Sequence, residues 1–163
     1  MSGIGITLRA LHDGERDLET DLLGVAERHR TEHEVHHVAT DVARWSREHA
    51  ARLAALGPGH GVELSGPRDH TAPGALTALR EKAAQALGRR PETGLLLLED
   101  LRDLHLAAVR NSLHWEMLAQ TAQATRDRAL LDLATDCHPQ TLRQMRWTNT
   151  MIKVLSPQLL VSV

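Results

Sequence analysis

The sequence contains no phenylalanine and no tyrosine, and three tryptophans are its only aromatic residues. Strands favour aromatic and β-branched side chains, so this lack argues against a β-sandwich. The remaining apolar residues, chiefly leucine, valine and alanine, suit the packing of helices on helices. We therefore expect an all-α fold.

Cysteine is nearly absent as well. The single Cys137 excludes an internal disulfide framework and is consistent with a reducing compartment. The run of four leucines at 95–98 is far shorter than the ~20 residues that cross a bilayer, and the N-terminus does not resemble a signal peptide. These features predict a soluble, cytoplasmic protein with no membrane partner.

Neither sign of charge dominates. The chain carries 19 Lys and Arg against 21 Asp and Glu, and its basic residues are spread along the whole length. A nucleic-acid binder usually gathers basic residues on one face, so we expect no nucleic-acid partner. A length of 163 residues is typical of one domain, and residues 1–163 are predicted to form it.

Apolar residues repeat at steps of three and four in several segments, as in bundle helices. The long segments are 7–29, 32–56, 91–124 and about 128–155. Thr31-Glu32-His33-Glu34 matches a capping box at the start of the second. Gly57-Pro58-Gly59 is expected to end that helix and Ser156-Pro157 the last one. A short extra helix is expected at 74–88.

The connections between these segments predict how the helices are joined. Short joins within each pair predict two antiparallel hairpins. The connection from Gly57 to Pro91 is long enough to run the full length of the bundle. We therefore expect a four-helix bundle of two antiparallel hairpins joined by a long crossover that carries the short helix.

Each expected long helix has a polar residue where the apolar spacing requires a core residue. These residues are Glu15, His49, Asn111 and His138, with His114 one step from the third seam. In the crossover arrangement their heights agree to within about one or two turns. We expect them to converge on one layer in the middle of the bundle.

Two interpretations of this layer are open. Glutamate and neutral histidine are ligands for iron, manganese or zinc, so the layer is a candidate site for one transition metal. Its ligands would be Glu15, His49 and His138, helped by Asn111 or His114.

The alternative is a hydrogen-bonded layer with no metal or cofactor. Glu15 then pairs with a histidinium, while Asn111 and Thr141 satisfy the remaining polar groups. Such a layer can fix the register of the helices. Pro139 is expected to kink the fourth helix there and to free a carbonyl group.

The helix layout and the segment Ser46-Arg47-Glu48-His49-Ala50-Ala51-Arg52-Leu53 resemble the ferritin-like superfamily of di-iron carboxylate bundles. The segment is similar to the E-x-x-H stretch of the second helix in that family. The resemblance implies that Glu15 matches the glutamate of the family's first helix and His49 the histidine of its second.

The sequence also departs from the family pattern. Ser46 stands where the bridging glutamate would precede His49, and Asn111 replaces the glutamate of the third helix. The fourth helix has no E-x-x-H, and His138 and Gln144 are its nearest candidates. The resemblance therefore implies the fold with a degenerate or rebuilt site, and no working di-iron oxidase or ferroxidase.

Four histidines crowd the turn between the first two helices: His29, His33, His36 and His37. His29, His33 and His37 have i, i+4 spacing, and together with an E-x-x-H that starts at Glu34 they would make a surface metal clamp on a continuous helix. Because the helix is expected to break there and capping accounts for Glu34, we favour a solvated turn with titratable histidines.

The sequence thus predicts a ferritin-like bundle with a degenerate or rebuilt metal layer. If it is an enzyme, which the sequence leaves open, redox or Lewis-acid chemistry on a small substrate suits an open metal position. The alternative is a metal-free structural or protein-interaction bundle, expected to be a homodimer. The apolar tail Leu159-Leu160-Val161 with Val163 is a candidate surface for packing on the bundle or on a partner.

Overall fold

The computed structural model describes residues 1–70, 74, 78, 81–82, 85 and 93–162. Within these residues there are four long helices and no strand. The long helices are α1 (Gly3–Arg28), α2 (His33–Leu56), α4 (Thr93–Thr125) and α5 (Arg128–Val161), and a short 3₁₀ helix, η1 (Gly57–His60), follows α2. The expected all-α class is confirmed.

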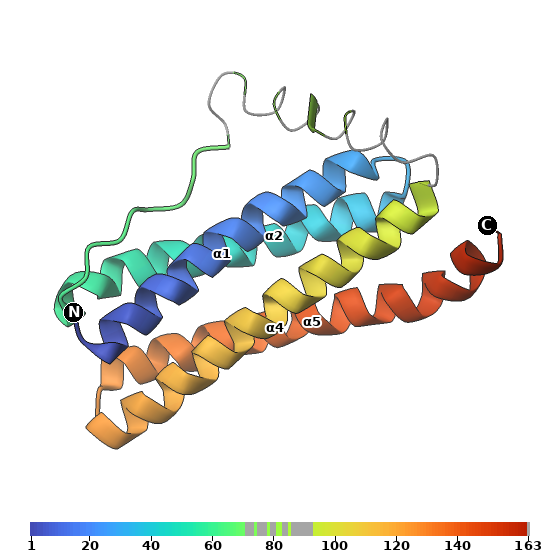
Figure 1. Ribbon diagram of the computed structural model, residues 1–163. Coiled ribbons are helices and arrows are strands. Elements are labelled where there is room, and N and C mark those ends of the chain that lie inside the picture. The colour runs from blue at the N-terminus through green and yellow to red at the C-terminus, as the bar shows by residue number, and fades with distance from the viewer. Residues whose placement is uncertain (71–73, 75–77, 79–80, 83–84, 86–92, 163) are drawn as a thin grey trace.

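The long helices form two antiparallel hairpins that pack on each other (Figure 1). Helix α1 packs along α2 and α4 along α5, and the hairpins meet through α1 with α4 and α2 with α5. Helix α2 ends where α1 begins, whereas α4 begins at the opposite end of the bundle (Figure 1). No helix among the described residues is long and apolar enough to span a membrane.

The chain after η1 runs along α1 in the same direction as that helix. The carbonyl of Ser65 accepts a hydrogen bond from His12, and Arg68 donates to the hydroxyl of Thr20, two turns further along α1. These bonds hold residues 61–70 against the first hairpin. The expected helix at 74–88 lies for the most part outside the described residues.

The start of α2 differs from the expected capping box. Glu32 is its N-cap, and no side chain caps that end. The turn is closed through the backbone instead, because the amide of Glu32 donates to the carbonyl of His29 and the amide of His36 to that of Glu32. Thr31 therefore lies outside the helix, exposed to solvent.

The end of α5 also differs, because the helix continues through Pro157 to Val161. Proline removes one bond of the helical ladder. The close packing of Leu159 against Gly94 of α4 compensates, since a Cβ atom at Gly94 would come within 2.8 Å of the Leu159 side chain. Leu160 is 57% exposed, so only part of the apolar tail packs on the bundle.

Candidate functional site

A layer of polar side chains divides the apolar core into two clusters. On α1, Leu8 and Leu11 belong to one cluster and Leu18 and Leu22 to the other, with Glu15 between them. The same division occurs on every long helix. The buried polar residues between the clusters are Ser46 and His49 on α2, Asn111 and Ser112 on α4, and Thr141, Gln144 and Thr148 on α5.

Glu15 and His49 meet directly in this layer. The Nδ1 atom of His49 lies 3.2 Å from Oε1 of Glu15, and the indole Nε1 of Trp115 donates to the same oxygen at 3.1 Å. The second ring nitrogen, Nε2, lies 2.7 Å from Oε1 of Gln140. Each imidazole nitrogen thus faces an acceptor oxygen, as an imidazolium requires.

The surroundings of His49 favour its charged form. Burial by itself lowers the pKa of the imidazole, but the neighbouring Cys137 side chain and the hydrogen-bonded, charged Glu15 outweigh this and raise the pKa to about 10. Both Glu15 and His49 are almost completely buried. The pair is therefore a carboxylate and an imidazolium held together away from water.

Trp115 supports this pair in two ways. Besides the hydrogen bond to Glu15, its ring packs edge-on against that of His49, with the centroids 5.7 Å apart and an interplanar angle of 83°. The apolar spacing of the helices predicts neither this role of Trp115 nor the contact of Gln140 with His49. A buried indole N–H normally needs an acceptor, so a hydrogen-bond partner is expected for any tryptophan in the core.

Gln144 makes a second, neutral connection between α5 and α2. Its amide donates to the carbonyl of Val42 at 3.0 Å and to the hydroxyl of Ser46 at 2.9 Å. The ferritin-like resemblance leads one to expect metal ligands at the positions of Ser46 and Gln144. In this protein the amide of Gln144 and the hydroxyl of Ser46 bind each other instead.

The structure does not bring His138 to Glu15 and His49. Its Nε2 lies 2.8 Å from the hydroxyl of Ser112 on α4, and its ring is partly exposed. The reason is the rotation of α5 about its axis, which turns the preceding residue, Cys137, into the core instead.

Asn111 lies in the layer, but it packs on backbone. Its side-chain oxygen lies so close to Gly14 of α1 that a Cβ atom there would overlap it. His114 lies outside the pair's hydrogen bonds and is only partly buried. Burial, reinforced by the charge of Arg110, lowers the pKa of His114.

The residues of the layer do not match a di-iron site or a three-ligand site. Among the residues that the structure describes, Glu15 is the only carboxylate of the layer, and both nitrogens of His49 are already hydrogen-bonded. Among the described residues, no group of three or more His, Cys, Asp or Glu is placed to hold a metal ion. The hydrogen-bonded alternative is met in its ion pair, because Glu15 and His49 contact each other. Its other part is not met, since Oε2 of Glu15, Nδ2 of Asn111 and Oγ1 of Thr141 are buried without a hydrogen-bond partner among the described residues.

A second, partly buried ion cluster lies at the end of α1. Arg28 donates two hydrogen bonds of 3.0 Å to the carboxylate of Asp100 on α4, and His29 Nε2 lies 2.7 Å from the same group. Burial raises the pKa of the Asp100 carboxyl, but the bonds from His29 and Arg28 prevail and lower it. The cluster joins the two hairpins where the turn to α2 begins.

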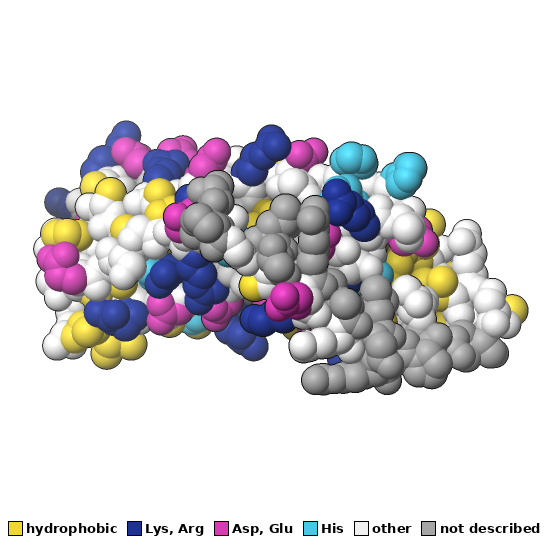
Figure 2. Space-filling model, turned by 90° about the horizontal axis from the view of Figure 1, so that it is seen from above, with side chains coloured by type: hydrophobic (Ala, Val, Ile, Leu, Met, Phe, Trp, Pro, Cys, Tyr) yellow, Lys and Arg dark blue, Asp and Glu magenta, His cyan; other side chains and the backbone are white. Residues whose placement is uncertain are grey.

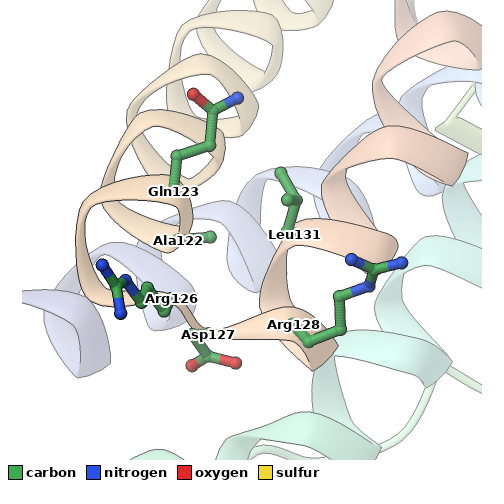
Figure 3. A pocket seen from close by; sticks show the side chains of 6 residues that line it. All are labelled: Ala122, Gln123, Arg126, Asp127, Arg128 and Leu131. Atoms are coloured by element: carbon green, nitrogen blue, oxygen red, sulfur yellow. The ribbon is translucent and has the colours of Figure 1, made fainter.

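An open cavity of about 510 Å³ lies at the turn between α4 and α5 (Figure 3). Arg126 and Arg128 extend to opposite sides of Asp127 (Figure 3). The carboxylate of Asp127 is already engaged, because it caps α5 at the amide of Leu130 and pairs with His60. The polar side chains that line this cavity do not point toward a common centre (Figure 3).

Comparisons of the chain with protein-family models, with curated proteins and with solved structures found no match.

Proposed function

We propose that the protein is a homodimeric interaction module, in which the polar layer sets helix register and the outer face of α4 binds a second copy. The observation that supports this proposal is an apolar stripe on α4, made of Leu106, Leu113 and Met117, which are 54%, 55% and 55% exposed. Steps of seven and four residues place these side chains within about 40° around the helix. We call them the α4 stripe.

The α4 stripe lies opposite the face with which α4 contacts the core. Leu104, Ala108 and Trp115 form that buried face, and each lies about half a turn around the helix from the stripe. A helix of a soluble bundle usually carries polar residues on its outer face. An outer face with three large apolar side chains instead is typical of a binding surface.

Helix α5 extends this surface. Leu142 is 43% exposed. It lies between His138, which contacts Ser112, and Met145, whose carbonyl lies 3.2 Å from His105 Nδ1. Leu142 is therefore level with the middle of α4, beside the α4 stripe.

The charges that flank the stripe favour a second copy of the chain as its partner. When two copies of α4 cross antiparallel about a two-fold axis near Val109, Leu106 of each copy meets Leu113 of the other. Arg102 and Glu116 stand seven residues before and after Val109 on one flank, and both are largely exposed. The same operation brings them together in two equivalent ion pairs. Arg110, close to the axis, turns its long side chain toward solvent in this dimer.

The finer fold assignment also belongs to this proposal. We infer a ferritin-like connectivity, because α2 ends and α4 begins at opposite ends of the bundle and residues 61–70 run along α1 (Figure 1). In this interpretation the protein keeps the connectivity of di-iron bundles, while an ion pair and neutral hydrogen bonds occupy the place of the metal site.

The first experiment measures oligomeric state. Tag-free protein is examined by light scattering after size exclusion and by sedimentation, as wild type and as Leu113→Glu. We expect a wild-type dimer and a folded monomeric variant. Val154→Glu is the matched control, because Val154 on α5 has the same 55% exposure and lies outside the stripe. A monomeric wild type, or a dimer that withstands Leu113→Glu, contradicts the proposal.

A charge-reversal series tests the two-fold geometry. Arg102→Glu and Glu116→Arg each place like charges in contact and should raise the dimer Kd by about two- to tenfold. The double variant restores opposite charges and should recover most of this loss. If the double variant is no better than the single ones, the antiparallel arrangement is wrong.

A further inference from the structure

A pair of exposed histidines lies in the first turns of α2. All eleven histidines belong to the described part of the chain, and only His33 and His37 are exposed. Figure 2 shows histidine side chains gathered on the surface toward one end of the bundle. His33 and His37 stand four residues apart, hence on one side of the helix, and their ring centroids are 6.4 Å apart.

We propose that His33 and His37 form a two-imidazole site for a divalent transition metal of the zinc, nickel and copper class. Imidazole nitrogen is a preferred ligand of these ions. With metal–nitrogen bonds of about 2.0–2.1 Å and tetrahedral angles, two rings on one ion have centroids about 5 Å apart. Both side chains are exposed and can close this small difference by rotating. Water completes the coordination.

A neighbouring histidine, His36, holds the first turns of α2 in place. His36 Nδ1 lies 2.8 Å from the carbonyl of Ala26, so its ring ties the first turns of α2 to the end of α1. Its ring also packs edge-on against His37, with centroids 5.1 Å apart. The backbone that presents the two ligands is therefore anchored, which reduces the ordering needed on metal binding.

The charges around the pair are compatible with a cation. The N-terminal end of a helix carries partial positive charge and disfavours a cation. Glu32, the N-cap, and Glu34 in the first turn are both exposed and supply compensating negative charge. No side chain caps the N-terminal end of α2. A metal that links His33 to His37 across one turn therefore stabilises this end of the helix.

Residues His33 to His37 also match the H-E-x-x-H pattern, in which two histidines of one helix bind zinc and the glutamate acts as a base. Peptide hydrolysis by such a site needs a third protein ligand. No group of three possible ligands placed to hold a metal occurs in the part of the chain that the structure describes. The proposed role is therefore reversible metal binding, which stabilises the turn between α1 and α2.

Titration calorimetry of tag-free protein with Zn²⁺ and with Ni²⁺ tests the site. We expect one ion per wild-type chain, reversed by a chelator. His33→Ala and His37→Ala should each weaken binding by about tenfold or more. His138→Ala, which removes a histidine from the other hairpin, should bind like wild type. The proposal is overturned if wild type shows no saturable metal binding. It is also overturned if His33→Ala and His37→Ala both bind the metal as tightly as wild type.

Thermal unfolding provides a second measurement. A ligand that binds only the folded chain raises Tm with its concentration. Zn²⁺ should therefore raise the Tm of wild type and of His138→Ala but not of His33→Ala. An equal rise in all three proteins would place the bound metal elsewhere. The site lies on α2, so its test does not depend on the dimer through α4.

Discussion

Alkaline pH should weaken the fold through the buried pair of Glu15 and His49. The pKa of His49 is raised to about 10 in the folded chain, whereas an unperturbed histidine titrates near 6.5. When folding raises a pKa, its stabilisation is complete below the unfolded value and disappears as pH rises through the folded value. The free energy of unfolding should therefore fall between about pH 6.5 and about pH 10.

The size of the effect follows from the same difference in pKa. The two values differ by about 3.5, and each unit corresponds to about 1.36 kcal/mol, so the whole window represents on the order of 5 kcal/mol, which the interactions of His49 with Cys137 and with Glu15 share. Glu15 and His49 are 0% and 1% exposed, which leaves little water to screen the pair. A loss of this size is comparable with the total stability of many domains, about 5–15 kcal/mol.

Two variants isolate the contribution of the pair. His49→Gln removes the titrating group and leaves the Glu15 carboxylate buried without a counter-charge, which should cost about 3–5 kcal/mol near neutral pH. The double variant Glu15→Gln/His49→Gln leaves no unpaired charge and should lose less than His49→Gln alone. Neither variant should show the fall in free energy of unfolding at alkaline pH that we expect for the wild type.

The assay is urea unfolding followed by helical circular dichroism at intervals across this pH window. All proteins carry Leu113→Glu, so that dimer dissociation does not enter the free energy. The series is repeated with Cys137→Ala, because that thiol also faces His49. His33→Gln is the control for the loss of an exposed histidine. If wild type and His49→Gln lose stability in parallel as pH rises, the reasoning about the pair is wrong.

Three further substitutions test the packing around the layer and the second ion cluster. Gly14→Ala should lower stability by about 1–3 kcal/mol in urea unfolding, because its methyl group meets the Asn111 side chain, and Gly14→Ala/Asn111→Ala should recover most of that loss. Trp115→Phe removes the indole donor to a buried carboxylate and should cost about 1–3 kcal/mol by the same measurement, whereas an unchanged midpoint would contradict the bond. Asp100→Asn should cost on the order of 3 kcal/mol near neutral pH, because it leaves His29 without a charged partner. Folding lowers the pKa of Asp100, so protonation of this carboxylate removes its stabilising effect. The difference in free energy of unfolding between wild type and Asp100→Asn should therefore shrink as pH falls through that pKa.

Much of the fold could be predicted from the sequence because helix periodicity is a local property. The steps of three and four located all four long helices, and the polar interruptions of these steps identified Glu15, His49 and Asn111 as members of one buried layer. A residue such as Glu15 stands out because its neighbours one turn away on either side, Leu11 and Leu18, are buried leucines. The end of α5 was misjudged, since the packing of Leu159 on α4 outweighed a local stop signal.

The sequence by itself determined that a carboxylate and an imidazole lie in the core, but only the tertiary structure decided what they do there. Successive residues of a helix differ by about 100° in direction, so a small rotation of α5 decides whether Cys137 or His138 faces the core. That rotation is set by packing against the other helices, and it brings Gln140 to His49. The charge of His49 depends on these surroundings, because burial and the facing acceptors act through space and leave no pattern along the chain.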